Sequence, residues 1–190
     1  MTPTDRRPPL PLEQLDPVQR AAADALIAGP RKAVKGPFIP LLRSPVLMDR
    51  VQRVGEYLRF DSALPTRLNE FATLLVARAT TQQFEWAIHA AAAAKAGTSA
   101  ATIAALREGA RPTDMSEDEA LVHDFCSELL ARHGVCDTTY ARALARFGER
   151  GVVDLTGLVG YFTMVCWVLN VAHTPPEPAP GIDPLPPLPR

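Results

Sequence analysis

The side chains best suited to proton transfer lie near the middle of the chain, in residues 82–89, QQFEWAIH. With about 100° between successive residues of a helix, four of them share one side: Gln82, Glu85, Trp86 and His89. Phe84 and Ile88 then face the opposite way. A Trp and small alanines continue the polar side where a solvated helix would carry charges, which indicates that the helix is enclosed. Polar groups on an enclosed helix need partners or a ligand.

Glu85 and His89 are spaced i, i+4, so their side chains can interact on a helix. A carboxylate beside an imidazole favours the protonated ring and fixes its tautomer, and such a pair can exchange protons near neutral pH. A Glu–His pair that only joins two helices explains the same spacing equally well. Both interpretations stay open at this point.

The remaining histidines lack the spacing of metal ligands, so we expect surface or helix-capping roles for them: His123, His133 and His173. The three cysteines include no C-x-x-C and are odd in number, which argues against a disulfide framework or a zinc site. Cys126 and Cys136 fall on different predicted helices, and a redox pair between them is an alternative. Cys166 lies in an apolar segment and is expected in the core.

Helix caps, prolines and apolar spacing predict that the chain is all-α, a single domain of six to eight helices. The predicted segments are approximately 17–28, 45–58, 65–79, 81–96, 99–109, 116–133, 137–147 and 152–172. Asp16 before Pro17 and Ser116 three residues before Glu119 are N-terminal cap signals. Residues 30–43 are expected to form a loop.

The domain is expected to span residues 16–173, between a flexible N-terminal arm, 1–15, and a Pro-rich tail, 174–190. The eight prolines of the tail exclude a helix there, and either a disordered end or a partner-binding motif fits its composition. With 20 basic and 21 acidic residues, the net charge of −1 excludes a generally basic nucleic-acid binder.

The N-terminus has no apolar core of a signal peptide, so we expect a cytoplasmic protein, and the excess of Arg, Ala and Pro is typical of a GC-rich bacterial genome. Residues 155–172 carry no charge and are about long enough to cross a membrane. Their glycines and threonines and the lack of a following basic cluster favour a buried or subunit-interface helix instead.

The chain resembles the carboxymuconolactone decarboxylase / alkylhydroperoxidase D-like superfamily. The most specific stretch runs from Arg67 to Gly97 and contains RLNE, the apolar run FATLLVAR, QQFEWAIH and a closing AG. The upstream segments GPF and LLRSP and the late segment from Tyr161 to Val171 are also similar to parts of this family. The resemblance implies the helical fold of that superfamily and a homo-oligomer, either a dimer, a trimer or a hexamer.

The peroxidase branch of this family carries a Glu, then C-x-x-C, then a His. Glu70 and His89 keep that outer spacing, but Gln82 and Glu85 stand where the two cysteines would be. Reduction of peroxides in that branch requires a thiolate and a resolving thiol. The segment is more similar to the decarboxylase-like branch, which implies decarboxylation of a small lactone carboxylic acid with no metal or organic cofactor.

On this basis we expect Glu70, Glu85 and His89 to be catalytic, with protonated His89 quenching the carbanion left by CO₂. Gln82 would stabilise the oxyanion, and Trp86 would contact the substrate. An Arg would hold a substrate carboxylate in bidentate geometry, and the candidates are Arg43, Arg67 and Arg78.

Two alternative functions remain. One is a thiol-dependent peroxidase or disulfide reductase of the peroxiredoxin type, which the missing C-x-x-C disfavours. The other is a non-catalytic member of the family that binds a ligand. The expected partners are a small carboxylic acid and further copies of the chain, with neither nucleic acid nor membrane.

Overall fold

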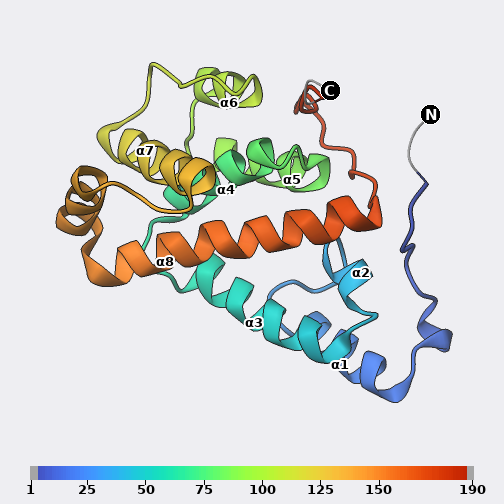
Figure 1. Ribbon diagram of the computed structural model, residues 1–190. Helices are drawn as coiled ribbons and strands as arrows, with labels where there is room; N and C mark the ends of the chain where they lie inside the picture. The colour runs from blue at the N-terminus through green and yellow to red at the C-terminus, as the bar shows by residue number, and fades with distance from the viewer. Residues whose placement is uncertain (1–3, 188–190) are drawn as a thin grey trace.

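The computed structural model describes residues 4–187, and this part of the chain is helical without any strand (Figure 1). A short 3-10 helix, η1, precedes eight α-helices, which confirms the all-α prediction. Their bounds are η1 Leu12–Gln14, α1 Pro17–Ala28, α2 Phe38–Leu41, α3 Pro45–Phe60, α4 Thr66–Ala79, α5 Gln83–Lys95, α6 Ala100–Arg107, α7 Glu117–Arg132 and α8 Asp137–Ala172.

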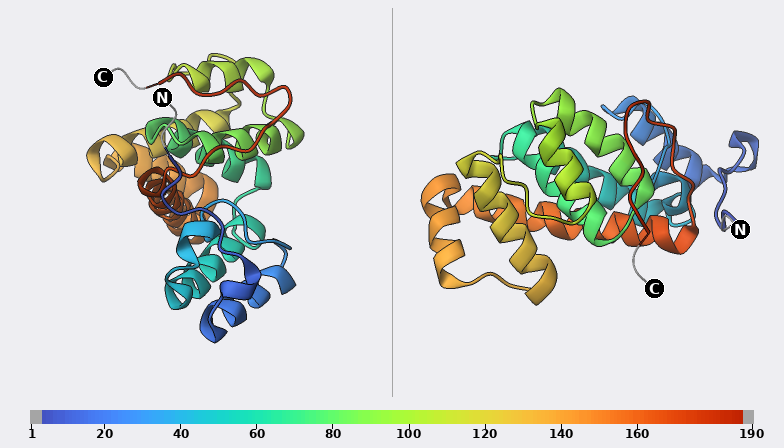
Figure 2. Two further views of the ribbon diagram at one scale, coloured as in Figure 1. Left: turned by 90° about the vertical axis from the view of Figure 1, so that its right-hand side faces the viewer. Right: turned by 90° about the horizontal axis from the view of Figure 1, so that it is seen from above.

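The long helix α8 lies between two groups of helices (Figure 1). Helices α4, α5, α6 and α7 cover one side, and α1, α2 and α3 cover the other, so that α8 is seen end-on between them in Figure 2. The core contains large, fully buried side chains from both groups and from α8, among them Phe71, Trp86, Leu26 and Leu155. The two groups therefore share one core, and α4 and α5 pack against each other within it.

The predicted caps and one predicted break are present. Asp16 and Ser116 each form a capping box at the start of α1 and α7. The expected end of a helix at residue 147 corresponds to Gly148, whose φ of 70° and ψ of 175° interrupt α8. Such dihedral angles are accessible essentially only to glycine, so the segments on either side of Gly148 run in different directions. The loop expected over residues 30–43 contains the short helix α2.

The Pro-rich tail is non-helical, as predicted, but it is packed against the domain rather than left as a free end (Figure 2). The indole N–H of Trp86 donates to the Asp183 carbonyl at 2.9 Å, and Gln83 bonds to both the N–H and the carbonyl of Leu185. Leu185 is only 3% exposed. The N-terminal arm also makes a contact, because the backbone N–H of Arg6 donates to Ala172 O at 2.8 Å. The outermost residues of both segments, 1–3 and 188–190, lie outside the described part.

Candidate active site

Three predicted catalytic side chains meet in the interior. The Nδ1 atom of His89 lies 2.5 Å from Oε2 of Glu70, and its Nε2 atom lies 3.2 Å from Oε2 of Glu85. Glu70 comes from α4, while Glu85 and His89 lie one turn apart on α5. All three side chains are buried. The packing of α4 against α5 thus joins residues that are 19 positions apart into one hydrogen-bonded triad.

The two carboxylates determine the charge of the imidazole. Burial acts to lower the pKa of His89, but the hydrogen bonds to Glu70 and Glu85 outweigh burial and raise the pKa above the ordinary value of 6.5. Burial likewise acts to raise the pKa of Glu70, and its bond to His89 leaves that pKa below 4.5. The ring of Phe162 packs edge-on against the imidazole, with centroids 4.9 Å apart. The two carboxylates therefore orient the imidazole and favour its protonated form.

A cavity of about 330 Å³ lies beside the triad, bounded by α5, α8, the end of α3 and the loop that precedes α2. This volume suits a small organic molecule. Glu85 and His89 line the cavity, whereas Glu70 stands behind His89 and does not. A ligand in the cavity would meet the Glu85 end of the triad.

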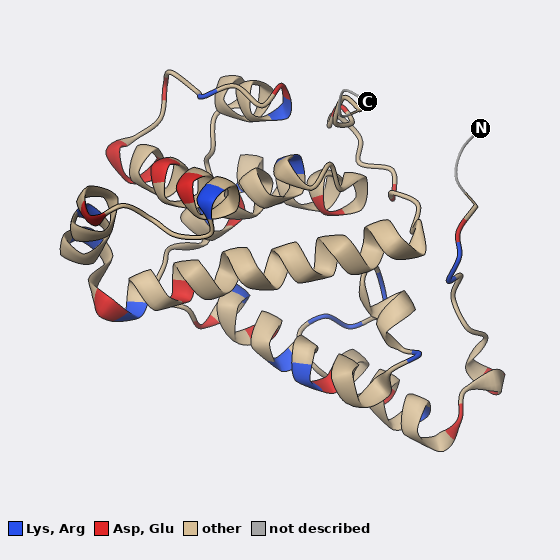
Figure 3. Cartoon of the chain, in the orientation of Figure 1, with Lys and Arg blue, Asp and Glu red and all other residues tan. Residues whose placement is uncertain are grey.

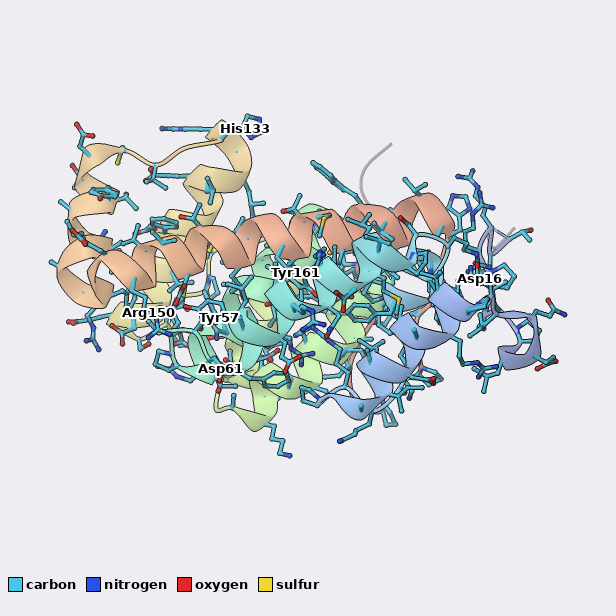
Figure 4. All side chains as sticks on the ribbon, turned by 90° about the horizontal axis from the view of Figure 1, so that it is seen from below. Asp16, Tyr57, Asp61, His133, Arg150 and Tyr161 are labelled. Carbon is cyan, nitrogen blue, oxygen red and sulfur yellow. The ribbon has the colours of Figure 1, made fainter. Side chains whose placement is uncertain are left out.

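The cavity also carries two arginines and a tyrosine that the sequence did not single out. Arg31 donates from Nη2 to the hydroxyl of Tyr161 at 3.4 Å, and Arg59 lines the same space. Figure 4 shows Tyr161 among the side chains between α3 and α8. A Cβ atom on Gly55 would fall 2.1 Å from Tyr161 Oη and 2.7 Å from Arg31 Nη2. Only glycine at position 55 permits this approach to α3.

Residues 45–121 match the model of the carboxymuconolactone decarboxylase family. This segment belongs to that family. The match extends from the start of α3 into α7 and includes Glu70, Glu85 and His89, whereas Arg31 and Tyr161 lie outside it. The predicted resemblance is confirmed over this stretch. No curated protein matches the chain.

The cavity-facing side of α5 differs from the predicted one. Phe84 and Ile88 line the cavity together with Glu85 and His89. Trp86 faces the tail instead, where its indole bonds to Asp183, so it does not contact the cavity. The helical projection assigned Phe84 and Ile88 to one side and Glu85 and His89 to the other, whereas the cavity extends across the boundary between these two sides.

Gln82 is the N-cap of α5 and not a cavity residue. Its φ of −91° and ψ of 106° are extended, so the helical projection does not apply to it. Its Oε1 accepts hydrogen bonds from the backbone N–H groups of Phe84 and Glu85, and its Nε2 donates to Asn170 Oδ1 at 3.0 Å. The side chain thereby fixes the first turn of α5, and the expected oxyanion contact is not in its reach.

The three predicted carboxylate-binding arginines lie outside the cavity. Arg43 donates to the Ile39 carbonyl and to the backbone of the N-terminal arm. Arg67 forms an ion pair with Glu119 at 2.7 Å. Arg78 lines a separate hollow on the side of α4 that faces α7. The sequence offered no means of ranking these residues against Arg31 and Arg59, because the decision depends on contacts between distant segments.

The cysteines do not form a thiol site at the cavity. Cys126 and Cys166 are buried, and burial raises the pKa of Cys166 to about 12 and that of Cys126 further. Cys136 is exposed and is the N-cap of α8. No cysteine lines the cavity, and residues 4–187 contain no group of three or more His, Cys, Asp or Glu side chains placed to hold a metal ion.

Proposed function

We propose that the protein is an acid–base enzyme of the lyase type that removes CO₂ from a small lactone or related carboxylic acid. The observation that carries this proposal is the triad at the cavity wall, where His89 is held between Glu70 and Glu85 and Glu85 faces the ligand space. Membership of residues 45–121 in the carboxymuconolactone decarboxylase family supports it. We place this activity in the bacterial cytoplasm.

The proposed reaction needs one proton at the cavity wall. As the bond to the departing carboxylate breaks, its electron pair passes into the adjacent unsaturated carbonyl and CO₂ leaves. The proton shared by His89 and Glu85 is then delivered to the carbon, and water restores it to the pair. Glu70 keeps His89 protonated before this step, because its hydrogen bond favours the charged ring.

Tyr161 takes the role that the sequence suggested for Gln82. Burial raises the pKa of the Tyr161 hydroxyl, so it remains a hydrogen-bond donor at neutral pH. Its hydroxyl lines the cavity and can donate to the oxygen on which negative charge develops. A peroxidase mechanism is disfavoured in comparison, because it needs a reactive thiolate and the cavity has no cysteine.

Release of CO₂ from a panel of small lactone acids tests the proposal. We expect His89→Gln and Glu85→Gln to remain folded and to lose about 10²–10⁴-fold in turnover, the usual contribution of a general acid–base group. Glu149→Gln, an exposed site on α8, is the matched control and should retain full turnover. Unchanged turnover in both triad variants would refute an acid–base role, and binding without turnover in the wild type would favour the non-catalytic alternative.

A further inference from the structure

Arg31 and Arg59 share a property that the acid–base chemistry does not explain. Both line the cavity and are half-buried, and the Nε atom of each is buried without a hydrogen-bond partner among residues 4–187. Neither takes part in an ion pair within the described part of the chain. Buried polar groups of folded proteins are nearly always paired, so two such arginines in one cavity require an account.

The two guanidinium groups also disfavour each other. Burial lowers the pKa of Arg31, and the positive charge of Arg59 lowers it further. Glu85 and Glu56 attract Arg31 only from beyond ion-pair distance. An arginine stays charged at any ordinary pH, so the repulsion is not relieved by loss of a proton. Each guanidinium is instead positioned by an aromatic ring, since Arg31 lies 4.6 Å from the centroid of Phe38 and Arg59 lies 5.3 Å from that of Phe60.

The carboxylates near the cavity do not pair with the two arginines. Glu70 and Glu85 both lie against His89, and Glu56, which also attracts Arg31, does not line the cavity. A further pair, Lys35 and Glu177 at 3.9 Å, lies at the solvent-exposed rim and adds no net charge. A bound anion could therefore pair with the two guanidinium groups from the cavity side.

We propose that Arg31 and Arg59 together bind one carboxylate of the ligand, with the hydroxyl of Tyr161 as an adjacent donor. The ligand class is a small, flat organic acid whose body lies over Glu85 and His89. The identity of this ligand as a substrate rests on the proposed function, whereas its binding does not. Planar guanidinium groups suit carboxylates because they donate two parallel hydrogen bonds.

The carboxylate held by the arginines is the one that stays in the product. A carboxylate loses its charge as it leaves as CO₂, so a strong ion pair with it would stabilise the ground state more than the transition state. The departing group must therefore lie away from Arg31 and Arg59.

Binding of 2-furoate and of its neutral isostere 2-furamide tests the subsite by calorimetry at neutral pH. We expect the wild type to bind the acid more tightly than the amide, by about tenfold or more, because a charge-assisted hydrogen bond contributes that much to affinity. Arg31→Gln and Arg59→Gln should each weaken 2-furoate binding by about tenfold or more and leave 2-furamide unchanged. Arg50→Gln is the matched control, because Arg50 lies exposed on the same helix as Arg59. Any of three results would overturn the proposal. The wild type could bind the acid and the amide equally well, the preference for the acid could survive both substitutions, or neither compound could bind.

The same titration in the His89→Gln variant separates this inference from the proposed function. If the arginine subsite exists and the protein is not a lyase, the preference for the acid persists there while no lactone acid releases CO₂ from the wild type. If the protein is a lyase without this subsite, CO₂ release depends on His89 and KM is unchanged by Arg31→Gln. If a glutamine variant fails to fold, the corresponding lysine variant, Arg31→Lys or Arg59→Lys, is used instead. Lysine keeps the positive charge but cannot donate two parallel hydrogen bonds. A lysine variant that prefers 2-furoate as strongly as the wild type does would also contradict the proposal.

Discussion

At the scale of single residues, the protonation of His89 links stability to pH. Its pKa in the folded state lies above 6.5, so its contribution to stability is fully present below about pH 6.5 and is lost as pH rises through the higher folded value. Glu70 has a folded pKa below 4.5, so its contribution is present above about pH 4.5 and is lost as pH falls through the lower value. The pair is therefore most stabilising between these two limits.

Glu70→Gln should destabilise the protein most within this pH window. The substitution replaces the carboxylate partner of a buried imidazolium, and we expect a loss of about 1–3 kcal/mol in the free energy of unfolding there. The difference from wild type should shrink once pH rises above the folded pKa of His89, where the ring is neutral, and once pH falls below the folded pKa of Glu70, where that carboxylate is protonated. Thermal melts of both proteins across this range measure the effect, with Glu149→Gln as the exposed control. A difference independent of pH would mean that His89 is neutral in the folded protein.

The sequence predicted the acid–base triad beside the cavity but not the arginines and the tyrosine that line it. Glu70, Glu85 and His89 could be found because their spacing survives on two consecutive helices and resembles a family motif. Arg31 and Tyr161 are 130 positions apart, and they meet only because Gly55 leaves room beside α3. No local sequence pattern indicates that these two residues meet. Nor does any local pattern indicate that the Trp86 indole bonds to the tail instead of facing the cavity.

At the scale of elements, the tail acts as a strap across α5. Leu185 is buried, and its backbone is paired with Gln83 on α5. Composition could predict that this segment is not helical, because proline lacks the N–H that a helix needs. Its packing could not be predicted in the same way, since it depends on contacts with α5 and α6, where Arg107 donates to the Pro184 carbonyl at 2.7 Å.

Leu185→Ala should loosen this strap. Removing a buried leucine side chain forfeits about 1.5–3 kcal/mol of burial, and we expect the indole of Trp86 to become more accessible to water. Tryptophan emission and urea unfolding measure both effects in a Trp167→Phe background, which leaves Trp86 as the single reporter. Pro187→Ala, at an exposed tail position, is the control. An unshifted emission in Leu185→Ala would show that the strap does not cover Trp86 in solution.

At the scale of the whole molecule, α8 is the one helix within residues 4–187 that is long and apolar enough to cross a membrane. Its most apolar window has a mean hydropathy of 1.8, and 56% of that window is buried against the other helices. The part of α8 after Asp154 has no Lys, Arg, Asp or Glu, and Figure 3 draws this stretch in tan. A central position between two groups of helices accounts for the buried side, and the exposed side still needs an explanation. That side contains Val153, Trp167 and Val171, which are 69%, 61% and 70% exposed.

We predict that this exposed side of α8 packs against another copy of the chain. Trp167 and Val171 lie one helical turn apart, and Val153 lies on the same side, separated from them by small exposed residues such as Gly157 and Gly160. Exposed apolar patches of this kind mark contacts between proteins. Light scattering coupled to size exclusion without detergent should give at least a dimer, and Trp167→Glu should shift it to the monomer because it places a charge in the interface. Tyr140→Glu, which changes another exposed aromatic residue on the far side of Gly148, should leave the assembly intact. A wild-type monomer would contradict the prediction, and a protein that stays in solution only with detergent would instead indicate that α8 inserts into a membrane.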